Sequence, residues 1–181
     1  MAINLQKGQR VSLDGSMKLA LVGLGWDVNQ FETGGNYDLD ASAFLLGAND
    51  KLILDSDFVF YNNLNTRNGA VVHQGDNLTG AGEGDDEVII IDFSKVPDEI
   101  QKIAICVSIY DESKRLTFGQ VSNAFVRVAK LSNEFDTVGE DQLRFDLGEE
   151  FSIETAVLVC EIYRYNGEWK FNAVGAGYSG G

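Results

Sequence analysis

The chain has 181 residues, of which 28 are acidic and 14 basic, giving a formal net charge of −14 at pH 7. That charge argues against nucleic acid as a partner, because phosphate contacts need Lys and Arg, and against electrostatic docking on anionic lipid. Apolar residues make up 44% of the chain, enough for one domain spanning residues 1–181 with a core of its own.

Short apolar stretches rich in Val, Ile and Phe recur along the whole chain, bounded by Gly, Asn, Asp or Ser, which is a pattern typical of β-strands. In chain order the expected strands are residues 10–13, 17–24, 39–46, 51–54, 58–61, 87–93, 102–110, 121–131, 155–165 and 168–174. Only residues 96–103 indicate a helical turn. Short strands without helical spacers predict an all-β fold, in which two antiparallel sheets pack as a β-sandwich.

Residues 62–84 differ from the rest of the chain, with ten Asn and Gly residues and only scattered apolar side chains. So long an irregular segment inside a compact domain is usually functional or disordered. We expect a bound metal ion to supply the order that hydrophobic burial cannot.

A faint internal repeat aligns residues 18–27 with residues 102–111, with Lys, Ala and the final Asp in common. Further on, Ala43-Phe44 resembles Ala124-Phe125. A duplication would give each half of the chain one sheet or half of the sandwich, whereas chance similarity between two strands would imply nothing.

Two features favour the cytoplasm. The N-terminal residues show no basic stretch followed by an apolar core, and no window approaches 18 apolar residues. Cys106 and Cys160 each lie inside an apolar run, so we expect buried, reduced thiols.

The most unusual segment is the acidic loop, residues 75–87, which contains five carboxylates and no positive charge. Two carboxylates about 4 Å apart repel by roughly 1 kcal/mol in water and by more in a protein, so a compact loop of this kind needs a counter-charge. Hard oxygen donors without thiol or imidazole favour Ca²⁺, and the glycines let backbone carbonyls turn inward. The side-chain oxygens in this segment come from Asp76, Asn77, Thr79, Glu83, Asp85, Asp86 and Glu87.

Three further acids stand at the ends of expected strands. Asp38 and Asp40 alternate with Leu39 and therefore share one face of a strand, and Asp27 closes another apolar strand after Trp26. We expect Asp27, Asp38 and Asp40 to complete the site from one side while the acidic loop wraps it from the other. Each group alone is typical of a solvated turn or a polar strand entrance; together they predict one or two Ca²⁺ ions.

Other motifs in the sequence are weaker indications of function. Residues 175–180 fit G-x-G-x-x-G but are followed by no helix that could hold a phosphate. His73 is the one histidine, and we expect it at the rim of the long loop. An enzyme using the metal ion on a phosphate-type substrate stays open as an alternative, although Arg67 is the nearest basic residue in sequence. A subunit of a repeating assembly, with the loop as interface, is a third interpretation.

The motifs resemble those of the TerD family of bacterial tellurium-resistance and stress proteins. The resemblance covers essentially the whole chain and is carried by Gly75-Asp-Asn-Leu-Thr-Gly-x-Gly-x-Gly-Asp-Asp-Glu87, Gly25-Trp-Asp27, Asp38-Leu-Asp-Ala-Ser-Ala-Phe44, Phe118-Gly-Gln-Val-Ser-Asn-Ala124, Glu161-Ile-Tyr-Arg164 and Trp169-Lys-Phe171. It implies a cytoplasmic β-sandwich that binds Ca²⁺ and is encoded among tellurite, phage and colicin resistance genes. It also implies Ca²⁺ ligands at Asp27, Asp38, Asp40, Asp76, Asn77, Asp85, Asp86 and Glu87, with carbonyls of Leu78 and Thr79 as further candidates.

We therefore expect a non-enzymatic, Ca²⁺-dependent binding or scaffold module. The expected partners are other tellurium-resistance proteins, with a membrane-embedded protein as one option, and neither nucleic acid nor direct membrane insertion is expected.

Overall fold

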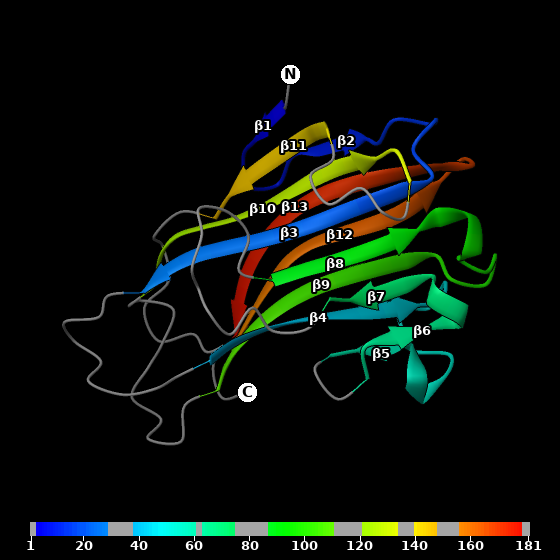
Figure 1. Cartoon of the computed structure of the whole chain (residues 1–181), viewed down its shortest axis with the longest axis horizontal. Coiled ribbons are helices and arrows are strands. Elements are labelled where there is room, and N and C mark those ends of the chain that lie inside the picture. The colour runs from blue at the N-terminus through cyan, green and yellow to red at the C-terminus, as the bar shows by residue number, and fades with distance from the viewer. Residues whose placement is uncertain are drawn as a thin grey trace.

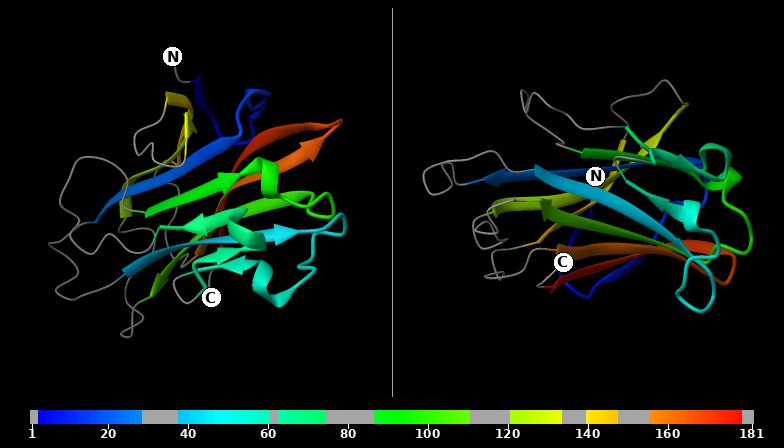
Figure 2. Two further views of the ribbon diagram at one scale, coloured as in Figure 1. Left: turned by 45° about the vertical axis from the view of Figure 1, so that its right-hand side comes forward. Right: turned by 90° about the horizontal axis from the view of Figure 1, so that it is seen from below.

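Two β-sheets pack face to face in the computed structural model of the chain (Figure 1), which describes residues 3–28, 38–60, 63–74, 87–110, 121–133, 140–147 and 156–178. Seen from below, the sheets form two stacked layers (Figure 2). The predicted all-β sandwich is thereby confirmed.

The first sheet has seven strands in the order β1-β11-β10-β3-β8-β7-β6. Its strands are β1 (Ile3–Leu5), β11 (Glu140–Asp146), β10 (Val121–Leu131), β3 (Leu19–Val28), β8 (Glu87–Asp92), β7 (Val71–His73) and β6 (Asn65–Thr66). Neighbouring strands are antiparallel except for β1 and β11, which are parallel.

The second sheet has six antiparallel strands in the order β2-β13-β12-β9-β4-β5. They are β2 (Arg10–Ser12), β13 (Glu168–Tyr178), β12 (Ala156–Tyr165), β9 (Lys102–Tyr110), β4 (Asp38–Leu46) and β5 (Phe58–Val59). Helical structure among the described residues is limited to the 3₁₀ turns η1 (Asp55–Asp57), η2 (Arg67–Gly69) and η3 (Phe93–Lys95). In that part of the chain, no helix has the length and apolar character needed to cross a membrane.

Alternation along the strands builds the core between the sheets. In β8 every second residue, including Ile89 and Ile91, is fully buried, and in β4 the buried residues are Ala41, Ala43 and Leu45. Burying each Leu or Ile contributes roughly 1.5–3 kcal/mol. The residues between them in β4, Asp40, Ser42 and Phe44, therefore lie on the outer face of the six-stranded sheet.

Several boundaries differ from those expected. The strands β1, β6, β7 and β11 are missing from the prediction because they are short or, like β11, mostly polar. Residues 51–54 form only an isolated bridge at Leu52, and the helical turn lies earlier than expected, at η3. The expectation of an irregular segment over residues 62–84 is wrong for its first half, which contains β6, η2 and β7.

The two copies of the faint repeat occupy comparable central places. β3 lies between β10 and β8 in one sheet, while β9 lies between β12 and β4 in the other. The strand after each copy crosses to the opposite sheet, so that β4 pairs with β9 and β10 pairs with β3. The halves of the chain are therefore interleaved, and the expectation that each would supply its own sheet is wrong.

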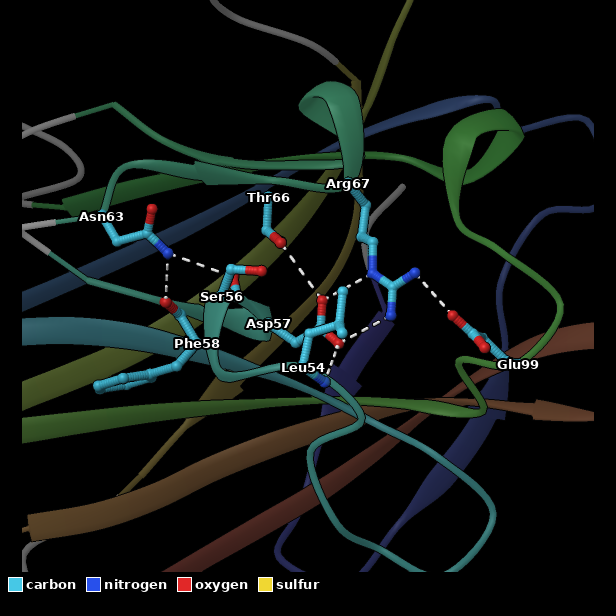
Figure 3. Close-up of polar contacts among 8 residues, drawn as sticks. All are labelled: Leu54, Ser56, Asp57, Phe58, Asn63, Thr66, Arg67 and Glu99. Atoms are coloured by element: carbon cyan, nitrogen blue, oxygen red, sulfur yellow. Dashed lines mark hydrogen bonds and ion pairs between the residues drawn. The ribbon is translucent and has the colours of Figure 1, made fainter.

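A buried ion pair lies at the side of the sandwich where the chain passes from β5 to β6 (Figure 3). The Asp57 side chain is fully buried and faces Arg67, whose Nε and Nη2 lie 2.7 and 2.9 Å from its two carboxylate oxygens. The Leu54 amide and the Thr66 hydroxyl also donate to Asp57, at 3.0 and 3.3 Å. Arg67 Nη1 donates in turn to Glu99 at 2.6 Å, so the pair joins η1, η2 and the segment before β9.

These contacts decide the charge of Asp57. Burial alone would raise the pKa of its carboxyl, but the hydrogen bonds from Arg67, Leu54 and Thr66 and the charge of Arg67 outweigh it and hold the pKa below its ordinary value. The backbone of Arg67 has a φ of 52°, a left-handed conformation that is uncommon outside glycine.

Candidate functional site

Strand termini from both sheets gather at one end of the sandwich, which we call the β3–β8 end (Figure 1). The end of β3 lies beside the starts of β8 and β10, through the pairs Leu24–Glu87 and Val28–Val121. The start of β4 lies beside the end of β9 through Asp38–Tyr110, and the start of β12 lies beside the end of β13 through Ala156–Tyr178. The end of β7 lies there too, because His73 pairs with Ile89.

Strand ends from both sheets bring predicted ligands to this end. Asp27 belongs to β3 of the seven-stranded sheet, where its backbone pairs with Ser122, and Asp38 begins β4 of the six-stranded sheet. Asp40 pairs with Ser108 and is half-buried on the outer face of its sheet, as is Ser42, so these two share a face as expected.

Glu87 is the one predicted ligand of the acidic loop that the structure describes. It begins β8 and, in contrast to Asp40, faces the core, with 3% of its surface exposed. Asp76, Asn77, Leu78, Asp85 and Asp86 lie outside the described residues.

The carboxylate of Glu87 meets the histidine of the chain. His73 Nε2 lies 2.7 Å from Glu87 Oε2, and both side chains are nearly inaccessible to solvent. The two groups are close enough for an ion pair, which requires a protonated imidazole ring. His73 is therefore a buried residue of β7 and not, as expected, a residue at the rim of the loop.

The strands β7 and β8 bracket residues 75–86. They are adjacent and antiparallel, and the Gln74 amide donates to the Val88 carbonyl at 2.9 Å. The connection between them is thus closed at its base by one backbone hydrogen bond and one side-chain pair. Closing a loop at its base removes the loop-closure part of the entropy cost of ordering it, while the larger cost of ordering each residue remains.

The donor chemistry available at this end suits a hard cation. Asp40 and Glu87 carry carboxylate oxygens, the ligand type that Ca²⁺ prefers, but Asp40 lies on the outer face of one sheet and Glu87 faces the core from the other. Among the described residues, no three His, Cys, Asp or Glu side chains converge closely enough to form a metal site by themselves.

The cysteines do not offer soft ligands. Both are free; Cys160 is buried, as predicted, whereas Cys106, which was also expected to be buried, is half-buried. Burial and then the nearby charge of Glu161 raise the pKa of Cys106 to about 11, and burial raises the pKa of Cys160 further above its usual range. Both thiols are therefore neutral near pH 7 and poor ligands for thiophilic metals.

A small apolar cavity lies between the sheets, lined by Leu24 and Trp26 on one side and by Val107 and Val157 on the other. Its volume of about 10 Å³ is no more than a single water needs, so it cannot receive an organic substrate.

His73 is the residue that sequence reasoning placed wrongly. The burial of His73 depends on β7, whose three residues lie within the segment that the sequence predicts to be irregular. The available signal was the run Val71-Val72-His73, in which alternation puts Val71 and His73 on one face.

Comparison with known proteins places the chain among related sequences. The model of the TerD domain matches residues 1–181. The "Tellurium resistance protein TerD" of Serratia marcescens is 51% identical, covering 100% of this chain and 93% of that protein. The "General stress protein 16U" of Bacillus subtilis (strain 168) is also 51% identical, with the same coverage, and the "Uncharacterized protein YceE" of that organism is 57% identical, covering 100% and 94%.

A solved structure shares the fold. The crystal structure of a homologue of telluride resistance protein (TerD) from Streptomyces coelicolor A3(2) superimposes with a TM-score of 0.70 and 23% identity, covering 91% of this chain and 92% of that one. At this identity the likeness concerns the fold alone.

Proposed function

The chain belongs to the TerD domain family, which includes proteins named for tellurium resistance and general stress, and on that premise we propose that it is a cytoplasmic Ca²⁺-binding protein acting in tellurite resistance and stress response. It acts as a Ca²⁺-dependent binding or scaffold module and not as an enzyme. Its partners are other tellurium-resistance proteins, one of which can be membrane-embedded.

One observation carries the proposal. The strand ends bearing Asp27, Asp38, Asp40 and Glu87 lie at one end of the sandwich, and β7 and β8 hold both ends of residues 75–86 there. The remaining candidate ligands Asp76, Asn77, Leu78, Asp85 and Asp86 belong to that connection. Acids on rigid strands and on a loop closed at its base are suited to sharing one or two Ca²⁺ ions.

Calcium titration tests the proposal. At a hundredfold excess over its Kd, Ca²⁺ stabilises the folded state by about 2.7 kcal/mol, which for a domain of this size raises Tm by about 5–10 °C. Thermal melts with Ca²⁺, with Mg²⁺ and with a chelator measure the shift, and isothermal titration gives the stoichiometry. A Tm that is the same in calcium and in chelator contradicts the proposal.

A matched pair of variants locates the ion. The double variant Asp85→Asn/Asp86→Asn is expected to lose the Tm shift. The control Asp55→Asn/Asp98→Asn makes the same charge change at exposed residues away from the β3–β8 end and is expected to keep it.

The alternative, a metal-assisted enzyme acting on a phosphate-type substrate, has less support. It would need a cation to hold the phosphate, and the Arg67 guanidinium is occupied by Asp57 and Glu99. Hydrolysis of generic phosphoesters that requires Ca²⁺ and is lost in Asp85→Asn/Asp86→Asn would favour the enzyme.

A further inference from the structure

A basic patch lies on the outer face of the six-stranded sheet, where β2, β13 and β12 are neighbours (Figure 1). Ile162 and Phe171 are fully buried, so the residues beside them in their strands, Tyr163 and Lys170, point away from the core. Tyr163 and Lys170 form a direct cross-strand pair. The guanidinium of Arg10, in β2, lies over the Tyr163 ring, 5.9 Å from its centroid. Two cations from different strands therefore flank one half-buried tyrosine.

Among the residues that the structure describes, neither of these cations has a carboxylate partner. Lys170 Nζ lies over the ring of Tyr165, 4.9 Å from its centroid, although Glu168 is only two residues away in sequence. Neighbouring cations without carboxylates are unusual in a chain that has 28 acidic and 14 basic residues. Contacts between a cation and a tyrosine ring orient the cation but do not neutralise it, so the charge of Arg10 and Lys170 stays available to a partner.

The acid within this part of the face is already engaged. Lys102, on the other side of Tyr163, lies 2.9 Å from Glu161 and 3.0 Å from Asp50. Glu161 also accepts a hydrogen bond from Asn172 at 3.3 Å. The patch therefore keeps a local positive charge, although the chain as a whole has a formal net charge of −14.

The spacing of the two free cations suits an extended acidic segment. Arg10 pairs with Asn172, two residues along β13 from Lys170, so Arg10 and Lys170 are diagonal neighbours, which lie about 7–8 Å apart in antiparallel sheets. In an extended chain, side chains two residues apart point the same way at a spacing of about 6.6 Å. Two carboxylates at alternate positions of a peptide can therefore reach both cations at once.

We propose that this patch, made of Arg10, Tyr163, Tyr165 and Lys170, is a docking site for an extended segment of a partner protein that carries acidic residues at alternate positions. Charge complementarity favours this occupant over a denser polyanion. Duplex DNA carries one charge per about 1.7 Å, and most of its phosphates would face the acidic remainder of this chain. The inference does not depend on the calcium site, so either proposal can fail without the other.

Fluorescence anisotropy with labelled peptides tests the inference. The probe is a short peptide in which Glu alternates with Thr. One comparison peptide carries Gln in place of Glu, and another has the same composition with its Glu residues grouped together. The alternating peptide is expected to bind, and more tightly at low salt, because the contacts are electrostatic.

Three results with these peptides would overturn the inference. The first is that the alternating peptide does not bind, and the second is that the Gln peptide binds equally well. The third is tighter binding of the grouped peptide, which would mean that charge density decides and not the spacing of the two cations.

A matched pair of double variants locates the site. Arg10→Gln/Lys170→Gln is expected to weaken binding of the alternating peptide by about tenfold or more, the loss typical of truncating residues at the centre of an interface. The control Lys18→Gln/Lys51→Gln makes the same charge change at exposed lysines outside the patch. It is expected to stay within about twofold of the wild type, since distant charges contribute little to affinity. Equal losses for the two variants would show that only net charge matters.

Amide chemical shifts of the wild type give a test that needs no substitution. Ser12 and Asn172 are the cross-strand partners of Lys170 and Arg10, and their amide signals are expected to move when the alternating peptide is added. The amides of Ile90 and Ala129, in the other sheet, are expected to stay in place. Shifts confined to the seven-stranded sheet overturn the inference.

Two further measurements examine other occupants of the patch. A DNA duplex that binds more tightly than the alternating peptide overturns the choice of a peptide. Light scattering that detects a dimer, lost in Arg10→Gln/Lys170→Gln, assigns the patch to a second copy of this chain and likewise overturns it.

Discussion

Among the residues that the structure describes, two carboxylates are buried, Asp57 and Glu87, and their surroundings differ. Asp57 is enclosed by Leu54 and by the adjacent residues Thr66 and Arg67, which contribute four contacts from two segments of the chain. Glu87 lies close to His73 and directly follows the connection that carries Asp76, Glu83, Asp85 and Asp86. A carboxylate surrounded by donors from the fold stabilises the fold, whereas one at the base of a loop can also transmit the state of that loop to the core.

The largest effect on the free energy of unfolding is expected when the ion pair of Asp57 is removed. Arg67→Met leaves Asp57 buried without its cation, and breaking such a pair costs about 3–5 kcal/mol. Urea unfolding measures the loss. The control is Lys95→Met, because the Lys95–Asp92 contact is long, at 3.9 Å, and exposed, so its removal is expected to cost less than about 1 kcal/mol. Equal losses for the two variants would show that the Asp57–Arg67 pair contributes no more than a surface contact.

A smaller effect on the free energy of unfolding is expected when the pH is lowered. Because the pKa of Asp57 in the folded state lies below the unfolded value of 3.8, the unfolded chain binds more protons than the folded one in this range, and stability falls as the pH falls. The contribution of Asp57 is fully present well above pH 3.8 and is lost as the pH drops through its folded pKa. In Asp57→Asn this part of the slope is absent. Urea unfolding of both proteins between pH 6 and pH 3 measures the slopes, and identical slopes would contradict the assignment.

The smallest effect concerns opening of the whole sandwich, which would expose its thiols to a reagent. Because the pKa of Cys106 is raised to about 11, native wild-type protein at pH 8 is expected to react with a thiol reagent only slowly. Cys160, in the core of β12, is expected to react only on unfolding. Fast modification of Cys160 in the native wild type would contradict the buried, neutral thiol.

The sequence predicted the fold from patterns that are local. Residues of β8 alternate between core and outer face, and β9 and β10 match the predicted bounds because their apolar runs are long. The strand β6 was missed because its two residues carry no periodic signal, and β7 was missed because the alternation in its three residues is too short to stand out. They are defined by pairing with β8, which is a property of the tertiary structure.

The candidate site was predicted in composition but not in geometry. The excess of acids over residues 75–87 is visible in the sequence, and so is the strand alternation that places Asp40 beside Ser42. That Glu87 faces the core while Asp40 lies on an outer face depends on which side of each strand packs against the other sheet. The His73–Glu87 contact depends in addition on the register of β7 against β8, and ten residues separate Arg67 from Asp57 without any pattern to link them.

The pairing of the N-terminal strands has a consequence for biosynthesis. β1 pairs with β11, and β2 pairs with β13 through Val11 and Phe171. On a translating ribosome, β2 emerges long before its partner, so the six-stranded sheet cannot be completed until the last strand has left the exit tunnel. Folding dominated by such distant pairings is slow, and the waiting strands present open edges on which nascent chains can associate. These edges stay open for longer than those of a sandwich assembled from successive hairpins.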